Sequence, residues 1–224
     1  MGQPAIHHGL DLSPNQKRLA FHQDDGNGGD VWVLDLDRGT SSRLTFDGPN
    51  EHTGAPAWSP DGTRIAYQTH RAGKWALRVK AASGSGAEEV LLESAVQVTP
   101  MAWSPDGQMI VYQLFDTKTG SDIWVLPLQG DRKSFVFQNS AANDNFPQVS
   151  PDGKWIAYGS NETGRGELYI RSFPNGVGKW TVSTIGGSMP RWRGDSKELF
   201  YLTGQRGVGG DLMSVELPPW VPWN

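Results

Sequence analysis

The chain has 224 residues with no cysteine, 28 glycines, 15 prolines and ten tryptophans, and its formal net charge of -4 comes from interspersed acidic and basic residues. The absence of cysteine excludes a disulfide framework and a thiol nucleophile, and the charge does not favour nucleic acid as a partner. Glycine and proline mark tight turns and tryptophan favours half-buried strands, so the composition indicates an all-β protein.

The N-terminal segment, residues 1–11, has neither the basic start nor the apolar run of a secretory signal, and the chain contains no stretch of 18 apolar residues. We therefore expect a soluble chain with no signal peptide and no membrane span. A cytoplasmic and a periplasmic location both fit the lack of cysteine.

One turn motif divides the chain into units. Ser-Pro-Asp-Gly stands at residues 59–62, 104–107 and 150–153, and degenerate copies stand at 13–16 and 193–196. Proline presets the backbone for the second position of a type I turn and glycine accepts the left-handed conformation at the fourth, so the motif joins two antiparallel strands. Five units of about 45 residues follow, a period typical of propeller blades.

Short apolar segments recur within each unit in one order, here named strands a to d. Strand a ends just before the turn, as at Ala57-Trp58, and strand b follows the turn at 64–67, 109–112, 155–158 and 198–201. Strand c is expected at 30–35, 122–126, 167–171 and 211–215, and strand d at 42–45 and 179–182. This order predicts a five-bladed β-propeller of four-stranded antiparallel blades in one domain, residues 1–224, with blades at about 5–50, 51–96, 97–142, 143–186 and 187–224.

The fifth unit lacks a recognisable strand d. Its tail, residues 218–224, contains three prolines, which cannot donate hydrogen bonds to a strand ladder. An open strand edge attracts another strand, so we expect this edge to be closed by a terminus or by a second chain, which includes a homodimer through the incomplete blade.

The repeats resemble the WD40-like propeller repeat of the C-terminal domain of TolB and of the propellers of prolyl-oligopeptidase-type peptidases. Residues 144–217, with Ser160-Asn-Glu-Thr-Gly164 and Leu168-Tyr-Ile-Arg-Ser-Phe-Pro174, also resemble the propeller attached to some bacterial serine/threonine kinases, without any kinase motif. The resemblance implies that strand a lines a central channel, and that the starts of strand a and the loops joining strands b and c share one face.

Polar residues gather at the predicted starts of successive a strands: Glu51, His52, Gln97, Asn143, Asp144 and Asn145. The first predicted function is therefore a binding module that uses this rim for a protein, a peptide or a small molecule. Such a function requires no cofactor. Fold resemblance by itself does not decide between binding and catalysis.

The alternative is a metal-dependent hydrolase of an ester, lactone or phosphotriester, with calcium, zinc or manganese in the channel. Its predicted ligands are His7, His8, Glu51, His52 and Asp144, because imidazole and carboxylate groups that converge on an axis can hold a divalent ion. Simpler interpretations stand beside it: Asp144 and Asn145 as turn caps, His52 as a loop residue, and the two N-terminal histidines as part of a disordered terminus or as a cloning remnant.

Two further patterns have structural interpretations. Trp58, Trp103 and Trp192 recur at one position of strand a, and repetition in register indicates packing between blades rather than a ligand platform. The acidic, glycine-rich segment 24–30 lacks the terminal glutamate of an EF-hand loop and is predicted to be a hairpin tip.

Overall fold

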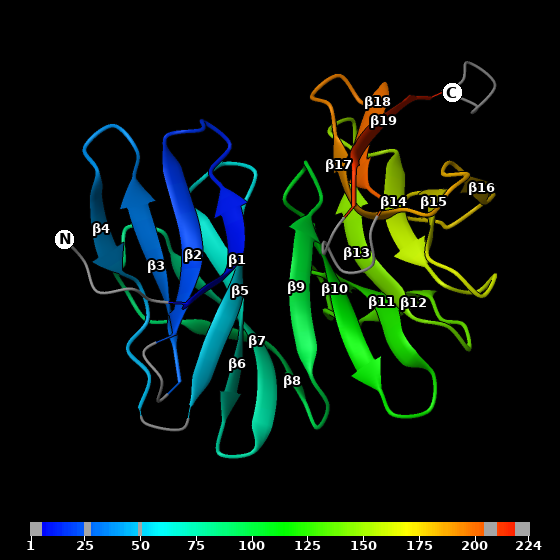
Figure 1. The fold of residues 1–224 in the computed structure, drawn as a ribbon. Coiled ribbons are helices and arrows are strands. Elements are labelled where there is room, and N and C mark those ends of the chain that lie inside the picture. The colour runs from blue at the N-terminus through cyan, green and yellow to red at the C-terminus, as the bar shows by residue number, and fades with distance from the viewer. Residues whose placement is uncertain (1–5, 25–27, 49–50, 204–209, 218–224) are drawn as a thin grey trace. The chain divides into compact units, whose positions relative to one another are not determined.

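The computed structural model describes residues 6–24, 28–48, 51–203 and 210–217, and every helix or strand assigned among them is a β-strand. These strands form five sheets in two compact units, residues 1–103 and 104–224 (Figure 1). The predicted class, a five-bladed β-propeller with an incomplete last blade, is confirmed over the described residues. They contain no helix of the length and apolarity that a membrane crossing needs.

Unit 1 holds two complete blades and the strand that begins the third, and strands adjacent in the chain are adjacent in each sheet. Its strands are β1 (Ile6–Leu12), β2 (Arg18–Asp24), β3 (Asp30–Asp35), β4 (Thr40–Arg43), β5 (His52–Trp58), β6 (Arg64–Arg71), β7 (Lys74–Ala81), β8 (Glu89–Ser94) and β9 (Val98–Trp103).

Unit 2 completes the third blade and contains the fourth and fifth. Its strands are β10 (Met109–Asp116), β11 (Gly120–Pro127), β12 (Phe135–Gln138), β13 (Asp144–Val149), β14 (Trp155–Ser160), β15 (Glu167–Ser172), β16 (Trp180–Thr181), β17 (Ser188–Trp192), β18 (Glu198–Leu202) and β19 (Leu212–Glu216). Among the described residues β19 is the outer strand of the fifth blade. The tail 218–224, one of the two alternatives for covering this edge, lies outside the described residues, so closure by a terminus and closure by a second chain both stay predictions.

The turns between the first two strands of each blade have the predicted geometry. Gly62, Gly107 and Gly153 take positive φ values of 68°, 70° and 73°. Gln16 and Ser196 adopt the same conformation in the degenerate copies, with φ values of 59° and 63°. The hairpin therefore imposes the left-handed conformation at the fourth position of the turn. Glycine lowers the conformational cost of this backbone geometry but is not required for it.

Side chains of the turn also hold it closed. The Ser59 hydroxyl donates to Asp61 Oδ1 at 2.5 Å and accepts from the amide of Arg64 at 2.9 Å. Blades three and four repeat this arrangement with the serine and aspartate at the same positions. The Ser-Pro-Asp-Gly motif is thus a complete hydrogen-bonded unit that sets the register of the first two strands.

Tryptophan links neighbouring blades, as the repetition predicted. The indole Nε1 of Trp103 donates to the carbonyl of Ala57 at 3.1 Å, and Trp58 and Trp192 make the same bond to the preceding blade at 3.0 Å. Trp58 and Trp103 are 5% and 7% exposed, so they belong to the packed interior. The second strands supply the rest of the core, with Tyr67, Tyr112 and Tyr158 fully buried.

The outer strands of the first and fourth blades end where a side-chain hydroxyl takes over a backbone hydrogen bond of the strand ladder. Thr45 Oγ1 accepts from the amide of Val31 at 3.0 Å and donates to the Asp30 carboxylate at 2.6 Å. Ser183 occupies the equivalent place beside Glu167 in the fourth blade. The predicted fourth strands, 42–45 and 179–182, are therefore observed as β4 (Thr40–Arg43) and the two-residue β16, because side-chain bonds compete with the backbone ladder there.

Candidate functional site

The first strand of four blades carries a bulge near its start. Register shifts separate His8 from Leu10, Gly54 from Ala57, Asn145 from Gln148, and Ser188 from Arg191. The bulged residues Gly9, Ala55, Phe146 and Met189 all have φ between 50° and 57°. Left-handed backbone at residues other than glycine is costly and is often retained at functional sites, and bulges re-aim the side chains beside them.

Residues near the starts of the first strands contact the second strand of the preceding blade. In unit 1, Thr99 Oγ1 donates to Gln68 Oε1 at 2.6 Å. In unit 2, Gln113 Nε2 donates to Asn145 Oδ1 at 3.1 Å, and Gln113 Oε1 accepts from the amide of Phe146 at 3.3 Å. A buried glutamine thus joins two blades at the same repeat position in both units.

His22 holds this position in the first blade. Its ring is only 2% exposed and packs against Gly54, where an added Cβ would lie 3.3 Å from His22 Cγ. The imidazoles of His22 and His52 meet edge to face, with ring centroids 4.9 Å apart and planes at 72°. The rim residue His52 is therefore held in place by a histidine of the neighbouring blade.

His52 lies in a row of ring side chains that crosses the second blade. Its Cα is paired with that of His70 on β6, and His70 is paired with Trp75 on β7. The rings of His70 and Trp75 stack with centroids 4.4 Å apart. All three side chains are half-buried, so they can still contact a ligand.

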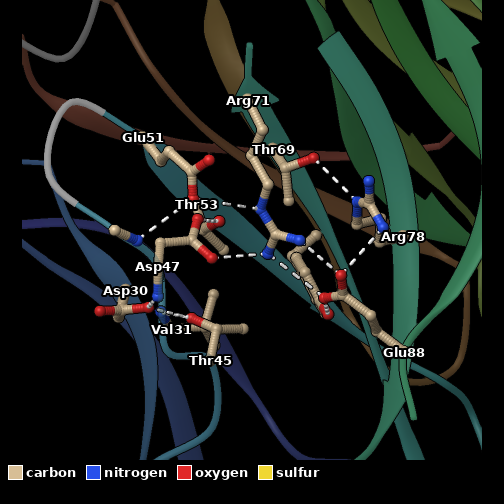
Figure 2. A network of polar contacts seen from close by, with 12 residues as sticks. Asp30, Val31, Thr45, Asp47, Glu51, Thr53, Thr69, Arg71, Arg78 and Glu88 are labelled. Atoms are coloured by element: carbon tan, nitrogen blue, oxygen red, sulfur yellow. Dashed lines mark hydrogen bonds and ion pairs between the residues drawn. The ribbon is translucent and has the colours of Figure 1, made fainter. Parts of the chain in front are cut away.

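An ion-pair network supports the segment that leads into β5 (Figure 2). The guanidinium of Arg71 bonds Asp47 Oδ1 at 2.6 Å and also binds Glu88 through both terminal nitrogens. Asp47 accepts the hydroxyl of Thr53, a residue of β5. Desolvation is the largest single influence on the pKa of Glu88 and acts to raise it, but the hydrogen bonds from Arg71 and Tyr67 and the charges of Arg71 and Arg78 together hold that pKa below its usual range.

Glu51 stands at the edge of this network. Its Oε2 accepts from the amide of Gly48 at 3.1 Å and lies 4.0 Å from Arg71 Nε. About a third of its side chain is exposed. The structure therefore brings the predicted rim residues Glu51 and His52 to adjacent positions, where Glu51 is weakly paired and accessible.

The predicted rim of unit 2 divides into exposed and buried residues. Asn143 is exposed, and its Oδ1 accepts from the amide of Ser121 at 3.2 Å. Asn145 is half-buried against Gln113. Gln97, the corresponding residue in unit 1, immediately precedes β9 and is half-buried.

Asp144 differs from its neighbours because its side chain is fully buried. Its Oδ2 accepts the Ser140 hydroxyl at 3.0 Å. Desolvation raises the pKa of this carboxyl, although nearby hydroxyls oppose the shift. These contacts favour the simpler interpretation, in which Asp144 fixes the turn before β13 rather than contacting a ligand.

The predicted metal ligands do not form a group in the described part of the chain. No three histidine, cysteine, aspartate or glutamate side chains come together there in an arrangement that could hold a metal ion. Glu51 and His52 belong to unit 1 and Asp144 to unit 2. The side chains of His7 and His8 lie outside the described residues, so the metal site stays a prediction.

Sequence reasoning missed His22, Gln68 and Gln113. All three stand at the fifth residue of the second strand, directly after an aromatic residue in Ala-Phe-His, Ala-Tyr-Gln and Val-Tyr-Gln. A polar residue that recurs at the end of a buried apolar strand was the available signal. It indicates that the side chain has a polar partner in the next blade.

Comparisons with known proteins agree with this architecture. The family model described as TolB beta propeller domain matches residues 51–217. A curated relative, "Uncharacterized protein Atu1656" of Agrobacterium fabrum, is 29% identical over 168 residues, which is 69% of this chain and 54% of that protein. The chain thus spans about half the length of the curated relative it matches.

Solved structures share the fold at low identity. The putative TolB from Agrobacterium tumefaciens superposes with a TM-score of 0.78 at 18% identity, over 96% of this chain and 78% of that one. TolB from Acinetobacter baumannii gives 0.76 at 19%, over 96% and 53%. An oligogalacturonate lyase in complex with manganese gives 0.73 at 14%, over 96% and 63%. At these identities the likeness concerns the fold alone.

Proposed function

Because the chain belongs to the TolB beta propeller domain family, we propose that it is a binding module that holds its ligand at the strand-start rim. We define this rim as Glu51, His52 and Gln97 of unit 1; Asn143 and Asn145 form the corresponding rim of unit 2, and each rim is proposed as a site by itself. Asp144 is buried next to Asn143 and Asn145 of unit 2 and does not contact the ligand. The ligand is a protein, a peptide or a small polar molecule.

The observation that carries this proposal is the repeated bulge at the start of the first strands. It maintains a left-handed backbone at Ala55, three residues after His52 in unit 1, and at Phe146, which directly follows Asn145 in unit 2. Glu51, Asn143 and Asn145 each accept a hydrogen bond from a neighbouring residue, and all three side chains stay partly accessible. Preorganised polar groups of this kind lower the entropic cost of ligand binding.

The chemistry of the rim indicates recognition by hydrogen bonding. The rim of unit 1 offers an amide, an imidazole and a carboxylate, the rim of unit 2 offers two amides, and neither contains a cluster of like charges. Amide and imidazole groups both donate and accept, which suits peptide groups and hydroxyls.

Selection from a random-peptide phage library on the immobilised chain, followed by calorimetry with the synthetic peptide, tests the proposal. We expect His52→Ala to weaken binding of a peptide held by unit 1, and Asn143→Ala to weaken binding of a peptide held by unit 2, in each case about tenfold or more, which corresponds to about 1.4 kcal/mol. Gln108→Ala, at an exposed residue of a Ser-Pro-Asp-Gly hairpin, is the matched control and should bind within about twofold of wild type. Equal affinities for all variants would refute the rim assignment.

Metal-dependent hydrolysis stays the alternative prediction. Elemental analysis of tag-free protein, with a chelator-sensitive assay on activated esters, lactones and phosphotriesters, tests it. Bound metal lost in His52→Ala would support it, and protein without metal or activity would exclude it.

A further inference from the structure

The fifth blade ends in an open strand edge. β19 is its outer strand, and among the described residues no fourth strand lies beyond it (Figure 1). Each of the other four blades has such a strand: β4, β8, β12 and β16. The ladder between β18 and β19 runs without a bulge over the whole of β19. A regular, unbulged edge of this kind pairs readily with another strand.

The bonds at the two ends of this ladder show which backbone groups lie on the open edge. The amide of Leu217 donates to the carbonyl of Lys197 at 2.9 Å, and the amide of Thr203 donates to the carbonyl of Asp211 at 3.1 Å. The direction of the backbone groups alternates from residue to residue in an antiparallel strand, so the odd-numbered residues bond β18. The even-numbered residues of β19 direct their N–H and C=O groups to the open side: Leu212, Ser214 and Glu216.

In the complete blades the same groups hold the fourth strand. Val31 occupies the position of Leu212 in the first blade. Its amide donates to Thr45 Oγ1 at 3.0 Å, and its carbonyl accepts from the amide of Leu44 at 2.8 Å. Leu168 makes the same two bonds in the fourth blade. Val31 and Leu168 are fully buried, whereas Leu212 is 72% exposed, so the fifth blade keeps the geometry that receives a fourth strand and leaves it accessible.

The residues that follow Leu217 are poorly suited to be that strand. Segment 218–224 has prolines at 218, 219 and 222, and a proline has no N–H to donate to a ladder. A fourth strand needs a run of N–H groups because it pairs with the third strand along its length. The open edge therefore fits a strand from another polypeptide better than it fits this tail.

The inward side chains of β19 specify part of what such a strand contains. Met213 and Val215 are half-buried, and Val215 packs against a buried cluster that includes Trp155, Ile170 and Leu199. Residues opposite Met213 and Val215 on an added strand would lie on the same face of the sheet. Apolar side chains fit these places, because cross-strand neighbours on one face pack together.

Glu216 specifies a charge. It is exposed, and the residue opposite it on β18, Glu198, is already bound by Arg193. A lysine or arginine opposite Glu216 on the added strand would therefore form a favourable cross-strand pair.

We propose that the open edge of β19 binds an extended segment of a partner protein, which joins the fifth blade as its fourth strand. The segment carries apolar residues opposite Met213 and Val215 and a basic residue opposite Glu216. Strand addition takes its affinity from main-chain hydrogen bonds and its specificity from alternate side chains. The edge shares no residue with either rim, so this proposal does not rest on the binding function proposed above.

Hydrogen exchange of the backbone amides, followed by NMR on the 224-residue chain, tests whether the edge is open. The outer amides of Leu212, Ser214 and Glu216 should exchange at least about tenfold faster than those of Met213 and Val215, which bond β18. Equal protection of both sets in dilute protein would show that the chain covers its own edge and would overturn the proposal. Protection of the outer amides that appears only as the protein concentration rises would assign the edge to a second copy, which would also overturn it.

A synthetic peptide supplies the added strand for a binding test. It has the sequence of residues 132–140, which include β12, the fourth strand of the third blade, and it carries Ser134→Val. In the register that β12 keeps with β11, Lys133 falls opposite Glu216. The same register sets apolar residues opposite the two inward residues of β19. At about 1 mM the peptide should slow exchange of the outer amides at least about tenfold, and unchanged exchange would overturn the proposal.

Two substitutions at Ser214 separate main-chain pairing from a side-chain contact. Ser214→Pro removes an outward N–H without removing a bond to β18, and proline is tolerated on the free side of an edge strand. It should weaken peptide binding about tenfold or more, whereas Ser214→Ala keeps the N–H and should bind within about twofold of wild type. Urea unfolding verifies that both variants are folded. Equal peptide affinities for the two folded variants would overturn the proposal.

Charge reversal tests the register. Glu216→Lys should weaken peptide binding about threefold, and a peptide that also carries Lys133→Glu should recover that loss on the Glu216→Lys protein. Unchanged affinity in both experiments would overturn the proposal, because the basic residue of the peptide would then not face Glu216.

Discussion

Replacing Gly29 by alanine tests how tightly the first two blades are joined beside His22. A Cβ at Gly29 would lie 2.0 Å from His22 Nε2 and 3.0 Å from two ring carbons. The ring cannot easily move away, because it is buried against Gly54 and meets His52 at 4.9 Å. The carbonyl of Gly29 also accepts from the amide of Thr53 at 3.1 Å, so a backbone shift would weaken a bond between blades.

The fourth blade supplies a matched control. Gly166 makes the same bond, accepting from the amide of Gly187 at 2.9 Å, but a Cβ there meets nothing nearer than 3.8 Å. Overpacking a buried site costs about 1–3 kcal/mol, and a change without a clash costs about 0.5 kcal/mol or less. We therefore expect Gly29→Ala to lower the free energy of unfolding by about 2 kcal/mol more than Gly166→Ala.

Urea unfolding of both variants, read by tryptophan fluorescence, measures the difference. The same change in a His22→Ala background tests its cause, because removing the ring removes the clash. Gly29→Ala should cost at least about 1 kcal/mol less in that background. Equal costs for the two glycines, or additive effects of Gly29→Ala and His22→Ala, would refute the reasoning.

Three further predictions concern hydrogen bonds and charges. The hydrogen bond from Ser59 lowers the pKa of Asp61 from 3.8 to about 2. The stability that the ionised Asp61 carboxylate contributes is therefore complete above about pH 4 and is lost as the pH falls through about 2. In acid titration the free energy of unfolding of Asp61→Asn should depend less on pH in that range than the free energy of unfolding of wild type. The hydroxyl of Tyr67 donates to Glu88 at 2.8 Å, whereas that of Tyr158 has no hydrogen-bond partner among the described residues; Tyr67→Phe should therefore cost about 1 kcal/mol in urea unfolding and Tyr158→Phe close to none, and equal costs would contradict this assignment. Arg71→Met leaves the buried carboxylate of Asp47 without its cation and leaves Glu88 paired with Arg78 alone, and it should cost about 3 kcal/mol or more at neutral pH. A loss below about 1 kcal/mol in thermal or urea unfolding would show that the network contributes little.

The repeat made most of the fold predictable. Ser-Pro-Asp-Gly identifies the hairpin between the first two strands because its side chains make short-range hydrogen bonds or set the backbone of the turn. Such local interactions can be predicted from a few adjacent residues. The outer strands were harder to place. Their length depends on whether a hydroxyl such as that of Thr45 replaces the ladder, and this is decided by a carboxylate about 15 residues away.

The candidate site was only partly predictable. Glu51, His52 and Asn143 stand at the starts of first strands as expected, and all remain partly accessible. Asp144 was assigned to the same rim, but its side chain points into the protein and binds Ser140. Sequence position places a residue near the start of a strand, whereas packing in the folded chain determines which side chain is exposed.

The sequence by itself determined the repeat, the turns, the order of the strands and the packing role of the recurring tryptophans, because these depend on local conformation and on a spacing that repeats along the chain. Only the tertiary structure decided which polar residues support the rim and which remain accessible. His22, Gln68 and Thr99 are far apart in the sequence, and they reach their partners, Gly54, His52 and one another, only when consecutive blades pack together. Burial and hydrogen bonding between blades, rather than residue type, therefore separate supporting from ligand-facing side chains in this protein.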